Sequence, residues 1–328
     1  RYEALPEEIA AAEKVRDDHR QSIQDAFVQW AGSVTESEID AKIPSSELLT
    51  HLPLSEGKGN DLAIKGEWNA TLHLDAPLEW KKTAGRPAAP VVSKDAPISL
   101  GPLGRVSAAD AFTLSAYINV PPKGTGGLIA KMDVGSEHRG WDLYRQGNAL
   151  SVHLIDRWPG YAVKVTTRDN VLRPGKWQHV TATYDGAGKA GGIKIYVGGN
   201  EMRLRTEAET LKPGASFLTD VPLQFGSRSS GAPAAGLSVS DFRFYRRSLT
   251  KSEANVLVRA DQLKRLIAKR EAGKPWSDKE RETLRTYYLN SVDPAYPGLL
   301  QHVATLTAEK SAIEARSPIT HIQQERKD

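Results

Sequence analysis

The feature that most constrains the fold is a pair of alternating segments on either side of a glycine-rich loop, between Gly175 and Gly199. Apolar residues recur there with a period of two: Val180, Ala182 and Tyr184 before the loop, and Ile193, Ile195 and Val197 after it. A period of two places successive side chains on opposite faces of a strand, and glycines let the chain reverse between strands. The segment therefore predicts an antiparallel hairpin within an all-β domain.

Segments of the same kind fill the middle of the chain, and helical periodicity returns at both ends. About ten short strand-like segments separated by Gly and Pro turns run from Leu48 to Tyr245, which is typical of a sandwich or jelly roll. Apolar spacing predicts one helix between Pro6 and Gly32, and capping-box patterns predict helices after Thr250 and Ser277. We therefore expect a helical segment at 1–47, a β-sandwich at 48–250 and a helical segment at 251–328, which begins or links to a further domain.

Composition excludes several classes of protein. The chain has 328 residues, a net charge of +4 and no run of basic residues long enough to indicate nucleic-acid binding. It has no cysteine, which excludes disulfides, thiol nucleophiles and covalent c-type haem attachment within the chain. It also has no apolar run near the roughly 20 residues of a membrane span. The chain begins at Arg1 without a visible signal peptide, so we expect it to be a piece of a longer precursor.

The amino-acid sequence of the hairpin is more specific than its alternation of apolar and polar residues. Residues 177–180 read Trp-Gln-His-Val, residues 184–186 read Tyr-Asp-Gly and residues 196–199 read Tyr-Val-Gly-Gly. This resembles the hairpin of laminin-G-like, concanavalin A-like jelly rolls, a family better known for binding than for catalysis. The resemblance implies a mainly β fold: a laminin-G-like sandwich, here flanked by N- and C-terminal α-helices.

Further segments narrow the resemblance. Residues 139–144 read Arg-Gly-Trp-Asp-Leu-Tyr, residues 152–159 read Val-His-Leu-Ile-Asp-Arg-Trp-Pro, and residues 284–289 read Leu-Arg-Thr-Tyr-Tyr-Leu. They are similar to segments of planctomycete cytochrome-c-like proteins, in which a laminin-G-like module lies between two planctomycete-specific domains of unknown function. The resemblance implies an exported parent protein, periplasmic or secreted, with the flanking domains as partners. It also implies that any haem is attached outside this chain.

Aromatic and polar residues gather where a glycan could bind. Aromatic faces stack on sugar rings, while Asp, Arg and His can hydrogen-bond to sugar hydroxyls. The candidate ligand-binding residues are Asp156, Arg157, Trp158, Tyr161, Tyr144 and His153. The alternative is that these residues fill the core or pack on the helices, and we expect that structural role for Trp141, Trp177 and His179.

The resemblance also implies a candidate metal site. Laminin-G-like modules often bind one calcium ion through one or two Asp residues and backbone carbonyls, and Ca²⁺ prefers such oxygen ligands. Residues 239–245 read Val-Ser-Asp-Phe-Arg-Phe-Tyr, where the family usually has two acidic residues. Ser240 takes the first acidic place, which leaves Asp241 as the candidate calcium ligand, and Gly198 replaces a polar residue of the hairpin.

Two functions of different classes remain open. The first is a non-catalytic, lectin-like module that binds a polysaccharide or glycan for a larger exported cytochrome-c-like protein. The second is a spacer that orients neighbouring domains without a ligand of its own. A glycoside hydrolase is less favoured, because glycosidases need paired carboxyl groups and no strand carries such a pair. We therefore expect no catalytic residues in this chain.

Overall fold

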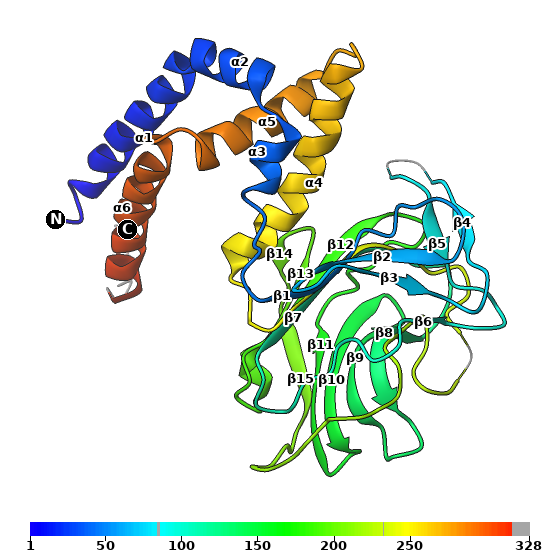
Figure 1. Cartoon of the computed structure of the whole chain (residues 1–328). Helices are drawn as coiled ribbons and strands as arrows, with labels where there is room; N and C mark the ends of the chain where they lie inside the picture. The colour runs from blue at the N-terminus through cyan, green and yellow to red at the C-terminus, as the bar shows by residue number, and fades with distance from the viewer. Residues whose placement is uncertain (84–85, 232, 317–328) are drawn as a thin grey trace, which may run out of the picture. The chain divides into compact units, whose positions relative to one another are not determined.

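The chain divides into two compact units (Figure 1). We analysed a computed structural model that describes residues 1–83, 86–231 and 233–316. One unit, Ile43–Val258, is a β-sandwich, and the other combines Arg1–Lys42 with the described residues from Arg259 onward. The two helical segments that the sequence places at opposite ends of the chain thus belong to one unit. None of the described helices is both long and apolar enough to cross a membrane.

One layer of the sandwich is an antiparallel sheet of ten strands among the described residues. Its main path runs β14-β13-β12-β7-β17-β1-β2-β3, and β5 pairs with both β17 and β4. The strands are β1 (Leu48–Leu52), β2 (Asp61–Gly66), β3 (Ala70–His73), β4 (Glu79–Lys81), β5 (Ala89–Val91), β7 (Phe112–Asn119), β12 (Gln178–Tyr184), β13 (Ile193–Val197), β14 (Asn200–Glu201) and β17 (Ser238–Tyr245).

The second layer is also antiparallel and has seven strands within the described part of the chain. Their order is β15-β11-β10-β9-β8-β16-β6. The strands are β6 (Ile98–Ser99), β8 (Gly126–Asp133), β9 (Arg139–Gln146), β10 (Ala149–Arg157), β11 (Tyr161–Thr167), β15 (Leu204–Glu209) and β16 (Gln224–Phe225). A 3-10 turn, Ala190–Gly192, precedes β13. Two antiparallel sheets with helices at both termini confirm the predicted fold class.

Aromatic side chains fill the space between the two sheets. The rings of Phe112 on β7 and Phe244 on β17 stack with centroids 5.5 Å apart, and Trp141 on β9 stacks on Phe244 at 5.4 Å. Trp141 is fully buried and donates its indole N–H to the carbonyl of Gly104 at 2.9 Å. A Cβ at residue 104 would lie 2.8 Å from the indole, so this contact requires glycine. Trp141 is therefore a core residue, as expected.

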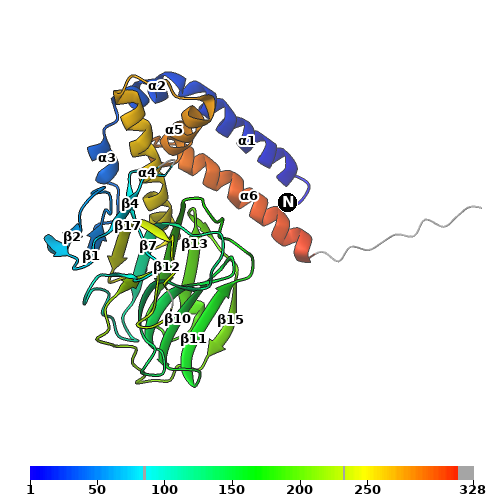
Figure 2. The same cartoon turned by 90° about the vertical axis from the view of Figure 1, so that its right-hand side faces the viewer.

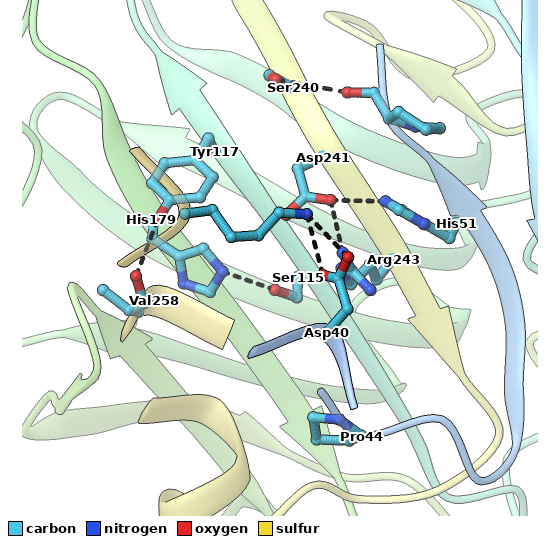
Figure 3. A network of polar contacts seen from close by, with 12 residues as sticks. Asp40, Pro44, His51, Ser115, Tyr117, His179, Ser240, Asp241, Arg243 and Val258 are labelled. Carbon is cyan, nitrogen blue, oxygen red and sulfur yellow. Dashed lines mark hydrogen bonds and ion pairs between the residues drawn. The ribbon is translucent and has the colours of Figure 1, made fainter. Parts of the chain in front are cut away.

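The hairpin predicted between Gly175 and Gly199 forms. Strand β12 pairs with β13, with Val180 opposite Val197 and Tyr184 opposite Ile193. Val180, Ala182 and Tyr184 face the core. His179 faces the other side of the sheet, where it is buried against Tyr117 of β7 with ring centroids 4.8 Å apart. Its Nε2 lies 3.0 Å from the Ser115 hydroxyl (Figure 3), which confirms the structural role expected for this histidine.

The helical unit is built by segments from both ends of the chain. Its helices are α1 (Leu5–Ser22), α2 (Gln24–Ser33), α3 (Glu36–Asp40), α5 (Asp278–Ser291), α6 (Tyr296–Arg316) and the greater part of α4 (Lys251–Glu271). Figure 2 shows α1 and α6 side by side, and Leu5 and Ala12 of α1 pack against Val303 and Leu306 of α6. Burial of one apolar stripe on each helix stabilises this pair.

The first helix is shorter than the sequence predicts. The expected single helix breaks at Ile23, whose ψ of 8° departs from helical geometry, and α2 begins at Gln24. One contribution comes from the Ser22 hydroxyl, which donates to the His19 carbonyl at 2.9 Å. Such side-chain bonds to the backbone compete with the helix and bend it. The break lets α2 pack on α5, where Phe27 meets Tyr288 with centroids 5.9 Å apart.

His179 predicts an acid sensitivity at mildly acidic pH. Burial lowers the pKa of His179 from 6.5 to about 3. Between these values the unfolded chain binds a proton that the folded chain excludes, so the free energy of unfolding falls as pH drops. We expect this group to cost about 2 kcal/mol of stability between pH 7 and pH 5, measured by urea denaturation. His179→Gln should remove that loss.

The matched control for this experiment is His73→Gln, because His73 is exposed on β3 of the same unit. That variant should keep the pH dependence of the original chain. Equal slopes for the original chain and His179→Gln between pH 7 and pH 5 would contradict the prediction.

Candidate functional site

Three neighbouring strands of the seven-stranded sheet place polar side chains in one row on its outer face. Strand register sets Asp142 of β9 opposite His153 of β10, and His153 opposite Lys164 of β11. Their strand neighbours Leu143 and Leu154 point into the core. Because side chains alternate along a strand, the buried leucines oblige the polar residues to face outward.

The carboxylate of Asp142 organises this row. It is fully buried, and its two oxygens accept from different partners. His153 Nδ1 lies 2.7 Å from Oδ1, and the Nε of Arg228 donates to Oδ2 at 2.7 Å. Burial alone would raise the pKa of the Asp142 carboxyl, but His153 and Arg228 outweigh it and hold that pKa below its usual range. The charged carboxylate of Asp142 thus holds the side chains of His153 and Arg228 in place.

Arg228 reaches this site from a loop that packs tightly on β8. It follows β16, which pairs with β8, three residues after Phe225. A Cβ on Gly127 would lie 3.2 Å from the Ser227 carbonyl carbon and 3.3 Å from the Arg228 nitrogen, so a side chain there would push the loop away. The guanidinium then lies over the ring of Tyr144, with its carbon 4.6 Å from the ring centroid.

Two aromatic rings lie beside His153. Its imidazole meets Tyr144 edge-on with centroids 5.4 Å apart and Trp158 with centroids 6.3 Å apart. Trp158 lies in the turn between β10 and β11, and its backbone N–H donates to the Glu137 carbonyl at 2.9 Å. Trp158 is 38% exposed as a residue, unlike the buried Trp141.

These residues surround a surface hollow of about 390 Å³. Aromatic, basic and neutral polar side chains line it together with one isoleucine: Thr125, His138, Tyr144, Gln146, His153, Ile155, Trp158, Lys164 and Arg228. A ligand there would meet ring faces and hydrogen-bond donors at once. This combination suits a ligand that has both apolar C–H faces and polar substituents.

The structure divides the six predicted ligand-binding residues into two groups. Tyr144, His153 and Trp158 line the hollow. Asp156, Arg157 and Tyr161 lie outside its lining. Asp156 pairs with Arg139 at 3.0 Å.

The ring of Tyr161 is already occupied by cations. The guanidinium carbon of Arg157 lies 4.6 Å from its centroid, and the Lys212 ammonium lies 4.8 Å from it. Tyr161 therefore offers less free ring surface for stacking on a sugar than Trp158 does.

Sequence reasoning missed Asp142 and six of the nine lining residues, among them Arg228, Lys164 and His138. A signal existed for two of them. Alternation places Asp142 on the same face as Tyr144, and Lys164 on the face opposite Val163 and Val165. Arg228 comes from a loop 86 residues beyond Asp142, and no local pattern connects the two.

Asp241, the predicted calcium ligand, lies on the outer face of the other sheet (Figure 3). It is the extra residue of a β-bulge in β17, where the register to β7 shifts between Ser240 and Arg243 and its φ is 52°. Its Oδ1 lies 2.6 Å from His51 Nε2 and accepts from Arg243 at 2.9 Å. Burial alone would raise the pKa of Asp241, but Arg243 and His51 hold it well below its usual range.

The Arg243 guanidinium thus supplies positive charge at the place where a metal ion would supply it. Among the described residues, no group of three or more His, Asp or Glu side chains could hold a metal ion. Backbone carbonyls and water would have to complete a calcium site at Asp241. Calcium binding there stays a prediction.

A calcium titration tests that prediction. A bound ion should raise the melting temperature in millimolar calcium relative to chelator, because a ligand that binds only the folded state stabilises it. Asp241→Asn should abolish this calcium-dependent rise, whatever it does to the melting temperature itself. An unchanged melting temperature would contradict the site.

The buried carboxylate of the hollow makes a separate prediction. Asp142→Asn removes the negative charge between Arg228 and His153 and should lower the free energy of unfolding at pH 7 by about 3 kcal/mol. Urea denaturation measures this loss.

The control is Asp169→Asn, because the Asp169–Arg203 ion pair is exposed at 3.2 Å and such pairs contribute about 1 kcal/mol at most. Equal stability losses in the two variants would show that Asp142 does not organise the site.

Comparison with known proteins supports the fold. Residues 93–255 match a laminin-G family model described as the concanavalin A-like lectin/glucanases superfamily. No curated protein matches the sequence. The binding domain of Paraclostridial Mosquitocidal Protein 1 has a similar structure, with a TM-score of 0.52 and 16% identity over 66% of this chain and 53% of that one.

Two further structures are more distant. The botulinum neurotoxin serotype D binding domain gives a TM-score of 0.48 and 14% identity over 69% of this chain and 53% of that one. The Ruminococcus gnavus IT-sialidase CBM40 bound to alpha2,3 sialyllactose gives 0.41 and 14%, over 51% of this chain and 94% of that one. The chain spans about half the length of the toxin binding domains. At these identities the likeness concerns the fold alone, so the family match and the two antiparallel sheets give this chain a sandwich of the concanavalin A-like fold.

Proposed function

We propose that this chain is a non-catalytic, lectin-like module and that the hollow bordered by Tyr144, Trp158 and Arg228 binds a glycan. The observation that carries the proposal is the arrangement around His153. The indole of Trp158 lies beside its imidazole, and so does the guanidinium of Arg228, which Asp142 holds. Sugars present C–H faces that stack on aromatic rings and hydroxyls that need hydrogen-bond partners, and this site offers both.

The polar groups of the site are held in place before a ligand arrives. Asp142 fixes His153 and Arg228, and the ring of Tyr144 supports the guanidinium from below. Groups that are already ordered lose little conformational entropy on binding. A rigid sheet face with fixed donors therefore favours specific recognition over a loose surface contact.

The charges of the site support binding rather than hydrolysis. Glycoside hydrolases use two carboxyl groups, roughly 5 Å apart in retaining enzymes and about 6.5–9.5 Å apart in inverting ones. None of the side chains that line the hollow is acidic. Asp142 lies beneath it, fully buried and engaged by two partners, so it cannot reach a glycosidic oxygen.

We further propose that the module serves a larger exported protein of the planctomycete cytochrome-c-like kind, periplasmic or secreted, with any haem outside this chain. The resemblance of residues 139–144 and 152–159 to segments of such proteins supports this proposal. In such a protein the glycan-binding sandwich would hold the flanking domains close to a polysaccharide.

A spacer function has one specific observation in its favour. Helices from both ends of the chain form a single unit, in which α1 packs on α6. Such a unit would bring the preceding and following parts of a longer chain close together. A spacer would need no hollow lined by an exposed tryptophan and a fixed arginine, so we rank it second.

Trp158 provides the direct test of glycan binding. Trp158→Ala should weaken binding to the best ligand of a polysaccharide and glycan array by about tenfold or more, because it removes the exposed stacking surface. Titration calorimetry with that ligand gives the dissociation constants.

Trp68→Ala is the matched control, since Trp68 is 48% exposed on the sandwich but lies outside the hollow. It should bind like the original chain. Absence of binding to every glycan tested, or an equal effect of both substitutions, would overturn the proposal.

A further inference from the structure

The lining of the hollow is basic. Arg228 and Lys164 carry positive charge, and no acidic side chain belongs to the lining. Burial and the neighbouring Arg228 lower the pKa of His138, so it is neutral at pH 7. Around neutral pH the permanent charges that face a ligand are therefore those of Arg228 and Lys164.

Lys164 is the less available of the two cations. Its ammonium pairs with Glu207 of β15 at 2.5 Å, and Glu207 also accepts from Arg205 at 2.9 Å. Burial raises the pKa of Glu207, but Lys164 and its other donors lower it to about 2, so this carboxylate stays charged and engaged. Lys164 is thus partly neutralised by a neighbour on its own sheet.

Arg228 keeps part of its guanidinium for a ligand. Its Nε donates to Asp142, and its Nη2 lies 3.5 Å from His153 Nδ1. Its Nη1 has no hydrogen-bond partner among the residues that the structure describes, and the side chain is 17% exposed. Asp142 and the ring of Tyr144 hold the guanidinium, and Arg228 belongs to the lining of the hollow.

We infer that this hollow selects glycans that carry a carboxylate, and that Arg228 binds the carboxylate while Trp158 stacks on a sugar ring. A planar guanidinium matches the geometry of a carboxylate better than an ammonium group does, and hydrogen bonds between the two charged groups are short and strong. Trp158 and Arg228 both lie beside the imidazole of His153, so one short acidic oligosaccharide can contact both. This inference rests on the proposed function and names its ligand class.

A pair of polymers that differ only in the carboxyl group tests the inference. Polygalacturonate and its carboxyl-reduced derivative have the same linkage and chain length. A glycan array adds further pairs, in which a uronate-containing or sialylated glycan is matched with its carboxyl-reduced counterpart. The chain should bind the carboxylated member of its best pair about tenfold or more tightly than the reduced member. Calorimetry at 0.15 M salt measures both affinities.

Two variants test whether Arg228 causes the preference for the carboxylated glycan. Arg228→Lys keeps a positive charge beside Asp142 but loses the fork, and it should lose most of the preference for the carboxylated member. Because Arg228→Gln alone would leave a buried carboxylate with one partner fewer, the double variant Asp142→Asn, Arg228→Gln removes both charges together. It should bind the two members equally while Trp158 still contributes.

Arg246→Gln is the matched control, because Arg246 directly follows β17 of the other sheet, is exposed and pairs with Glu67 at the surface. It should keep the full preference, which separates a local site from general attraction of anions to a basic protein. Equal, Trp158-dependent binding of carboxylated and reduced glycans would overturn the inference and leave the proposed function intact. A preference that survives in both Arg228 variants would also overturn it, whereas failure to bind any glycan would overturn the proposed function itself.

Discussion

The register between β9 and β10 determines both the core and the candidate site. Trp141 lies opposite Leu154, and Asp142 lies opposite His153. Because side chains alternate along each strand, a slip of one residue would exchange these faces and move a charged carboxylate into the aromatic core. The hydrophobic layer between the sheets thus positions the polar row, and the polar contacts need not be strong to stay in register.

Burying the Asp142 carboxylate costs desolvation free energy. What the carboxylate provides in return is a fixed geometry for His153 and Arg228. A buried ion pair often contributes little net stability, because desolvation offsets the attraction between the charges. Here the same carboxylate holds a histidine from the next strand and an arginine from a distant loop. Without it, the Nε of Arg228 would lose its hydrogen-bond partner, since nothing else in the described structure hydrogen-bonds this atom, and the guanidinium would be held over Tyr144 less firmly.

The sequence predicts the sandwich well because period-two alternation records which face is buried. It also indicates Tyr144, His153 and Trp158 as neighbours, since they lie on adjacent strands and the turn that follows. It could not reveal Arg228, which is brought in by pairing of β16 with β8. Nor could it separate Trp158 from Tyr161, because the register shift between Ile155 and Arg157 redirects the end of the hairpin. Tertiary contacts and a bulge, rather than local pattern, decide those positions.

The two outer faces of the sandwich carry similar chemistry but differ in what lies beside it. On the ten-stranded sheet, Asp241 holds His51 and Arg243, and Tyr117 donates to the Val258 carbonyl at the end of the sandwich unit. On the seven-stranded sheet, Trp158 is exposed beside the charged network of Asp142. The Asp142 network itself is no more exposed than the Asp241 network, because Asp142 is fully buried and His153 is 6% exposed. What distinguishes the seven-stranded sheet is the surface hollow that Tyr144, Trp158 and Arg228 line beside this network. The hollow and its exposed tryptophan, rather than the buried carboxylate, therefore separate the candidate binding site from the structural cluster.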